Sequence, residues 1–222
     1  MDILKHKIEL LGQNFFFFAP AGDDCFPGTL AGMNKNDWKL DKIDFKSGDA
    51  FVDIGCNIGL ISLFVARLFP YVQVYSFDPN PVAIQCLKLA MVENNLDNIK
   101  PYHLAIGEED KYDVEFVTYS ENETCTVEKT ISNLREIKYL SNMLSFGTMF
   151  DNLIEEDEIK YLKCDIEGGE FKLFDYIKEF RPDIFKNIEY LHIEIHPFDD
   201  SNPPTKKLKD LVTKQFGNKV FF

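Results

Sequence analysis

Positive charge is scarce in this sequence. It has 24 Lys and Arg residues against 37 Asp and Glu residues, so the formal net charge is −13 at pH 7. The basic segment formed by Lys206, Lys207 and Lys209 is too short to offset this excess. Because nucleic-acid binding depends on Lys and Arg side chains that neutralise phosphates, the composition argues against a nucleic-acid partner. The acidity favours solubility.

Cysteine clusters and long apolar runs are absent from the sequence. The five cysteines have irregular spacing, with no CxxC pair and no Cys/His cluster, which argues against structural zinc and predicts reduced thiols. No segment approaches the ~18 apolar residues of a membrane helix, and "FFFF" at 15–18 is too short for a signal peptide. We therefore expect a cytoplasmic protein with no membrane partner. The cysteines are Cys25, Cys56, Cys86, Cys125 and Cys164.

The composition is that of one globular domain. Hydrophobic residues make up 45% of the 222 residues and charged residues 27%, and no repeat or linker interrupts them. The expected organisation is a lead-in or lid over 1–48, a core over 49–200, and a C-terminal helix and strand over 201–222.

Strand-like and helix-like segments alternate through this core. Short apolar runs predict strands at 50–54, 72–77, 99–106, 159–164 and 190–195. Amphipathic segments predict helices at 60–68, 81–94, 169–180 and 204–216, and 219–222 has the pattern of one more strand. This alternation predicts an α/β fold with a doubly wound, mostly parallel sheet.

One segment breaks the alternation. The runs at 114–119 and 124–129 flank a polar "SENE" and predict a β-hairpin insertion. Residues 136–153 remain open between a strand or loop and a short helical turn.

The stretch "DAFVDIGCNIGLIS" lies where the first core strand gives way to the first core helix. Gly55 and Gly59 permit unusual backbone angles there, and ligands of open α/β sheets bind at this edge. The pattern D-x-G-x-N-x-G differs from the dinucleotide fingerprint G-x-G-x-x-G. Asp53 would repel a pyrophosphate and suits a ligand with an amino acid or sulfonium part. The alternative is a tight turn that binds no ligand.

Two further carboxylate segments follow predicted strands. Asp78 follows the second strand, where it could bind ribose hydroxyls or cap the next helix. In "KCDIEGGE", Asp165 and Glu167 could position a hydroxyl, act as a base or bind a divalent cation. Glu170 has a second interpretation as a helix-start residue, and we interpret Lys163 as an ion-pair partner within the sheet.

The segment "HIEIHP" places His192, Glu194 and His196 on one face of the last core strand. His196 lies nearest the strand end, where a neutral imidazole could accept a hydroxyl proton. The alternative is a histidine satisfied by local hydrogen bonds.

These motifs resemble, in sequence order, the FkbM-type S-adenosylmethionine-dependent methyltransferases. The resemblance covers roughly residues 50–197 and rests on "FVDIGCNIGLISL", "YSFDPNP", "NNL", "HLAIG", "LKCDIEGGE" and "HIEIHP". It implies a Rossmann-like class I methyltransferase fold and methyl transfer to a hydroxyl oxygen of a sugar or other small natural product. The implied cofactor-binding residues are Asp53, Gly55, Asn57, Gly59, Asp78, Asn80 and Ala105. The candidate catalytic residues are His196, Asp165 and Glu167, with no metal ligand assigned.

Two other functions remain open, a non-catalytic module that binds the cofactor or a nucleoside and a different nucleotide-using enzyme. A dehydrogenase lacks its glycine fingerprint here. The family's sheet ends with a hairpin of two more strands, whereas "KVFF" leaves room for one. The expected sheet is therefore incomplete, truncated or completed by a partner, and its open edge makes a homodimer plausible. Acceptor specificity is expected in 1–48 and 115–129.

Overall fold

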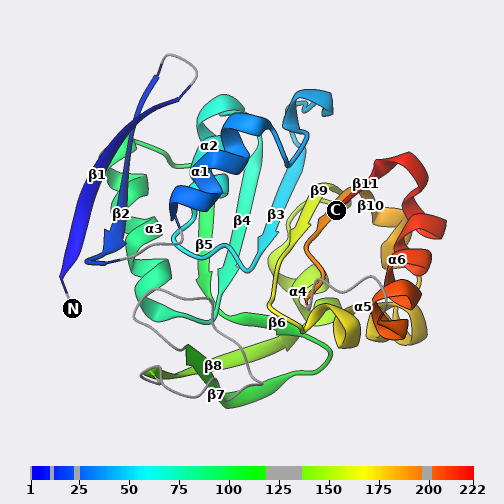
Figure 1. Cartoon of the computed structure of the whole chain (residues 1–222). Coiled ribbons are helices and arrows are strands. Elements are labelled where there is room, and N and C mark those ends of the chain that lie inside the picture. Colours follow the sequence, from blue (N-terminus) through cyan, green and yellow to red (C-terminus); the bar gives the residue numbers. More distant parts are fainter. Residues whose placement is uncertain (1, 11–12, 23–25, 119–136, 197–201) are drawn as a thin grey trace.

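The computed structural model describes residues 2–10, 13–22, 26–118, 137–196 and 202–222. Its centre is a six-stranded sheet in the order β11-β10-β9-β3-β4-β5, in which every neighbouring pair is parallel (Figure 1). This confirms the predicted parallel fold. The strands are β3 (Ala50–Ile54), β4 (Gln73–Asp78), β5 (Ile99–His103), β9 (Ile159–Cys164), β10 (Ile188–Ile193) and β11 (Val220–Phe221).

Helices bury both faces of this sheet. One apolar core joins α2 and α3 to one face, and a second core joins α4, α5 and α6 to the other. β3 is buried along its whole length because it is covered from both sides, which explains its continuous apolar run. The helices are α2 (Leu60–Leu68), α3 (Pro81–Asn94), α4 (Phe146–Leu153), α5 (Glu170–Phe180) and α6 (Pro203–Phe216).

The predicted strand at 99–106 is two strands in two sheets. β5 ends at His103, and the Leu104 N–H donates to the Asp78 carbonyl at 3.1 Å. β6 (Ala105–Gly107) then leaves the central sheet and pairs in parallel with β8 (Ile137–Ser145). A strand-like run does not reveal such a change of partner, because both halves have the sequence pattern of a strand.

The hairpin prediction needs correction at its second strand. β7 (Lys111–Thr118) pairs antiparallel with β8. The expected partner segment, 124–129, lies outside the described residues. Of the open segment 136–153, the described residues 137–153 form β8 followed by α4, whose first turn is capped by the Ser145 side chain. Sequence reasoning favoured the nearer segment because short hairpin loops are the commonest.

The N-terminal lead-in packs onto the core. β1 (Ile3–Leu10) and β2 (Gln13–Pro20) form an antiparallel hairpin, followed by α1 (Phe26–Lys35) and the short helix η1 (Leu40–Lys42). The Asn94 side chain of α3 hydrogen-bonds both the N–H and the carbonyl of Phe16 on β2. The "FFFF" run is therefore a strand that contributes to the apolar core.

The C-terminal segment adds one short strand. β11 pairs in parallel with β10 at the edge of the central sheet. No helix within the described ranges is long and apolar enough to cross a membrane.

Candidate active site

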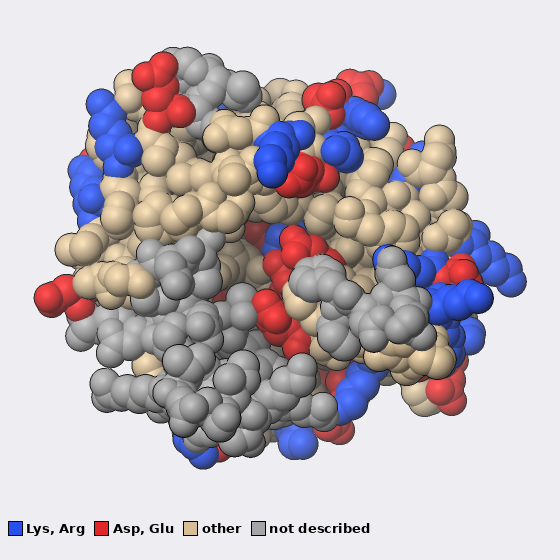
Figure 2. All heavy atoms as spheres, viewed as in Figure 1, with Lys and Arg blue, Asp and Glu red and all other residues tan. Residues whose placement is uncertain are grey.

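A large cavity lies at the carboxyl ends of the central strands. Its volume is about 1250 Å³. The carboxyl ends of parallel strands meet at one sheet edge, and the loops that follow β3, β4, β9 and β10 all reach this cavity. Figure 2 shows acidic side chains gathered beside a hollow near the centre of this face. The predicted site residues in its wall are Gly55, Asn57, Asp78, Asn80, Ala105, Asp165, Glu167 and His196.

The two glycines after β3 are required by neighbouring protein atoms. Gly55 and Gly59 have φ values of +76° and +81°. A Cβ atom on Gly55 would lie 1.7 Å from the Asp165 carbonyl oxygen, and one on Gly59 would lie 2.5 Å from Leu87. Only glycine allows these close approaches. The geometry therefore supports the tight-turn interpretation for the glycines, and Gly59 is absent from the described cavity wall.

Asp78 connects this turn to the end of β4. Its two carboxylate oxygens accept the backbone N–H groups of Asn57 and Asn80, each at 2.8 Å. The helix-capping interpretation of Asp78 is wrong, because Asn80 caps α3 through Val82 and Ala83. Asp78 is thus left to face the cavity.

The charge of Asp78 depends on its burial. Its side chain is buried, and this desolvation raises the pKa of Asp78 to about 6. The two backbone hydrogen bonds and Lys163 oppose the rise. At neutral pH the group is therefore a carboxylate close to its titration range.

Asp53 lies behind the cavity wall. It is fully buried and accepts a hydrogen bond from Ser62 Oγ at 2.7 Å, while its other oxygen lies 3.3 Å from Lys163 Nζ. Lys163 also donates to the Gly55 carbonyl and lies 3.3 Å from Asp165. This confirms Lys163 as an ion-pair partner. Asp53 thus orients Lys163 beneath the loop. It is not among the residues that line the described cavity.

Lys163 remains charged despite its burial. Burial lowers the pKa of an ammonium group, but the carboxylates of Asp53, Asp165 and Glu194 raise the pKa of Lys163 above its ordinary value. The same environment raises the pKa of Asp165, chiefly through burial and with contributions from Glu194 and Glu167.

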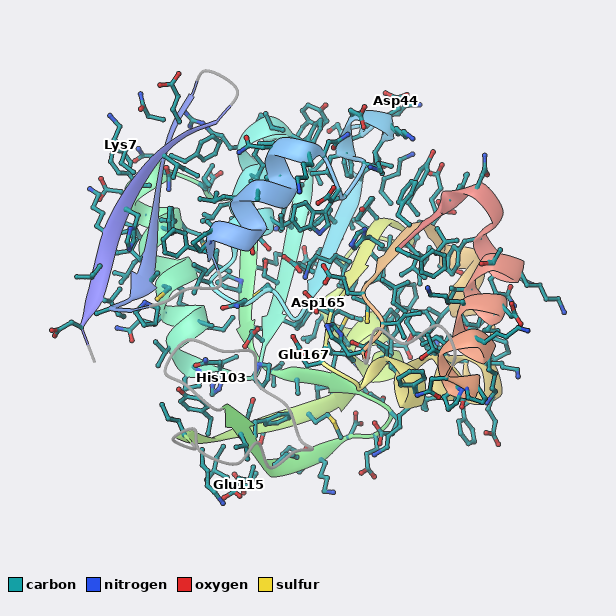
Figure 3. All side chains as sticks on the ribbon, viewed as in Figure 1. Lys7, Asp44, His103, Glu115, Asp165 and Glu167 are labelled. Carbon is teal, nitrogen blue, oxygen red and sulfur yellow. The ribbon has the colours of Figure 1, made fainter. Side chains whose placement is uncertain are left out.

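His196 lies among carboxylates. Its Nδ1 is 3.3 Å from Glu170 Oε1, and its Nε2 is 3.7 Å from Glu167 Oε2. Burial lowers the pKa of His196, but the carboxylates of Glu170, Glu167 and Asp165 raise it by more. The resulting pKa of His196 is about 9. At neutral pH His196 is therefore an imidazolium, and the expected neutral imidazole is not its ground state. Figure 3 shows Asp165 and Glu167 near the centre of the molecule, at the carboxyl ends of the central strands.

Glu170 braces the loop between β9 and α5. It is fully buried at the first position of α5, and its oxygens accept the N–H groups of Ile166 and Gly168 at 2.9 Å. Glu167 and Gly168 between them have positive φ angles of 54° and 104°. Glu170 thus stabilises an unusual backbone that carries Glu167, as well as bonding His196.

Asp165, Glu194 and His196 could hold a divalent cation. One ligand atom from each residue lies within 4.8 Å of the other two. This is the one group of three possible metal ligands among the described residues. Lys163 and the His196 imidazolium already offset the negative charge there. The expectation that no metal is needed stays a prediction.

Trp38 and Thr205 are among the residues of the cavity wall that sequence reasoning missed. Trp38 lies in the unpatterned lead-in, where its carbonyl accepts the Tyr161 hydroxyl at 2.6 Å. Thr205 lies in the first turn of α6. No sequence pattern distinguishes either residue, because their positions depend on long-range packing.

Comparison with known proteins gives a family and one curated relative. The family model described as "Methyltransferase FkbM domain" matches residues 53–218. "Methyltransferase 1" of Beauveria bassiana (strain ARSEF 2860) is 22% identical over 164 residues, which span 67% of this chain and 66% of the relative. The chain thus spans just under two thirds of that relative.

Solved structures match the chain at low sequence identity. M. jannaschii TYW2, in complex with AdoMet, matches with a TM-score of 0.50 and 13% identity, over 95% of this chain and 73% of that chain. Trm5b from Pyrococcus abyssi matches with a TM-score of 0.47 and 13% identity, over 96% and 48%.

The parallel sheet with helices on both faces and the cavity at its carboxyl edge define the Rossmann-like class of α/β fold. Within that class, the chain belongs to the methyltransferase FkbM domain family. The resemblance stated from the motifs is confirmed.

Proposed function

We propose that this protein binds S-adenosylmethionine and transfers its methyl group to a hydroxyl oxygen of a small neutral molecule, such as a saccharide. The observation that carries the proposal is the buried Asp78 carboxylate. It lies at the end of β4, is held by two backbone N–H groups, and faces a cavity of about 1250 Å³.

The cavity wall fits this cofactor chemically. The Asp78 oxygens accept one hydrogen bond each from the backbone, so each retains a lone pair for a ribose hydroxyl. Asn57, Asn80 and Ala105 line the same region, where they would surround the nucleoside. The carboxylates beyond it suit a positively charged sulfonium. Asp53 and Gly59 would support this site from behind.

The protein's own contribution is alignment and proton transfer. When bound, S-adenosylmethionine supplies an activated methyl group on sulfur. The acceptor hydroxyl would attack from the side of Asp165 and Glu167, and its proton would pass to Asp165, whose raised pKa favours protonation. The His196 imidazolium would stabilise negative charge on the acceptor oxygen, while Glu170 holds its ring.

Calorimetry with S-adenosylhomocysteine tests cofactor binding. Binding by the parent and its loss in Asp78→Ala would support the proposal. Asp175→Ala is the matched control, because Asp175 pairs with Lys207 on the surface. Absence of binding at millimolar ligand would contradict the proposal.

A methyl-transfer assay over neutral hydroxylated acceptors separates an enzyme from a non-catalytic module. Product formation would exclude the module. Binding of S-adenosylhomocysteine without transfer to any acceptor would favour it. A cytoplasmic location and a homodimer remain predictions.

A further inference from the structure

The cavity is larger than one small ligand requires. Its volume of about 1250 Å³ exceeds the ~300–1,000 Å³ typical of a small-molecule site. Asp78 ends β4, whereas His192 lies on β10, three positions along in the strand order. At ~4.8 Å per strand, this separation is about 14 Å. The cavity therefore has a second part, beyond the proposed nucleoside site.

Three buried polar atoms in the wall of this second part lack hydrogen bonds. Within the part of the chain that the structure describes, Trp38 Nε1, His192 Nδ1 and Thr205 Oγ1 have no hydrogen-bond partner. Their residues are 7%, 3% and 1% exposed, and all three line the cavity. Since buried polar groups are nearly always hydrogen-bonded in native proteins, three exceptions in one wall point to a missing ligand.

Separate segments contribute these three residues, the acceptor wall, to the lining of one cavity. Trp38 follows α1 and is anchored to β9 through the Tyr161 hydroxyl. The rings of Trp38 and His192 have centroids 6.1 Å apart. Thr205 lies at the start of α6, which packs on β10. The acceptor wall is thus built by the fold and does not belong to one loop.

The hydrogen-bonding capacities of the acceptor wall specify a ligand class. The Trp38 N–H can only donate, and the Thr205 hydroxyl can donate and accept. His192 Nε2 faces Glu194 at 3.9 Å, and a proton there leaves Nδ1 as an acceptor. Hydroxyl groups satisfy all three, because they both donate and accept. Seven acidic residues line the described cavity, against four lysines and the His196 imidazolium, and this acidic excess disfavours an anionic ligand.

We propose that the acceptor wall recognises a neutral, polyhydroxylated methyl acceptor, so that Trp38, His192 and Thr205 determine acceptor specificity. This inference rests on the proposed function. It places recognition partly in the lead-in, because Trp38 precedes the family match at 53–218.

Calorimetry on protein saturated with S-adenosylhomocysteine tests this recognition. The probes are methyl glucoside and its anionic counterpart glucuronate. We expect the glucoside to bind and glucuronate to fail. Trp38→Phe and Thr205→Val should each weaken glucoside binding about tenfold, with binding of S-adenosylhomocysteine unchanged. The control Thr213→Val, at an exposed position of α6, should leave both unchanged.

Thermal unfolding of the free protein provides a test that needs no acceptor. Because Thr205 Oγ1 has no partner, Thr205→Val should match or exceed Thr213→Val in melting temperature. A lower value would show that the hydroxyl is already bonded, for example to water, and would overturn the inference. Equal glucoside affinity in the parent and both wall variants, or no glucoside binding at all, would also overturn it. Failure of the parent to bind S-adenosylhomocysteine would instead refute the proposed function, leaving the unfolding comparison to decide the acceptor wall.

Discussion

Protonation of Asp78 should control cofactor affinity. Burial raises its pKa to about 6 in the free protein, and the proposed ribose contact requires the carboxylate. Below that pH a bound cofactor must first displace a proton. Affinity for S-adenosylhomocysteine should therefore be nearly constant above about pH 7 and fall about tenfold for each pH unit below about 6, which corresponds to about 1.4 kcal/mol per unit.

The stability of the free protein should change in the opposite direction. Between the unfolded pKa of 3.8 and the folded pKa of about 6, the folded state binds the Asp78 proton and the unfolded state does not. Folding stability therefore gains from this group as the pH falls through that window, by up to about 3 kcal/mol. A general acid-induced loosening of the fold would lower both quantities together.

Calorimetry at a series of pH values, paired with thermal unfolding, measures both effects. Asp78→Asn is the matched variant, since it keeps the shape and removes the titration. It should bind S-adenosylhomocysteine more weakly at neutral pH, by about tenfold to a hundredfold, with no further change down to about pH 5. A parent affinity that stays constant from about pH 7.5 to about pH 5 would refute the assignment of Asp78 to the cofactor.

Three further outcomes follow from the same geometry. Gly55→Ala should destabilise the fold by more than about 3 kcal/mol in denaturant unfolding, because its Cβ would collide with the Asp165 carbonyl. The control Gly28→Ala, where the added Cβ meets no neighbouring atom, should be neutral or stabilising. Equal effects of the two substitutions would contradict this account. Glu170→Gln should lower the pKa of His196 from about 9, as followed by NMR titration; an unchanged pKa would show that Glu170 does not hold the imidazolium. Chelation with EDTA should leave methyl transfer intact. Loss of activity on chelation, followed by its recovery when a divalent cation is added, would instead support a metal at the cluster containing Asp165.

The central fold was readable from the sequence because its signals are local. Four predicted elements, 50–54, 60–68, 81–94 and 159–164, coincide with β3, α2, α3 and β9. Apolar runs of strand length and helical periodicity arise wherever a segment is buried by its neighbours. The small sheet of β6, β7 and β8 was not predicted, since its pairing joins segments that are distant in sequence.

The sequence indicated where the candidate site lies, but not the surroundings of each side chain in it. Strand-end motifs correctly brought Asn57, Asp78 and Asp165 to one cavity. The sequence could not show that Asp53 is fully buried or that His196 is surrounded by carboxylates. Both facts depend on which side chains neighbouring strands place opposite each other.

By itself, the sequence determined the family, the parallel sheet and the sheet edge that carries the candidate site, because these follow from motifs and periodicities within short segments. Tertiary structure alone decided the protonation of Asp78 and His196, the supporting role of Gly55, and the presence of Trp38, His192 and Thr205 in the wall of one cavity. Burial and contact are properties of the packed chain, and they set the pKa values and leave unpaired the hydrogen-bonding groups on which the two proposals rest.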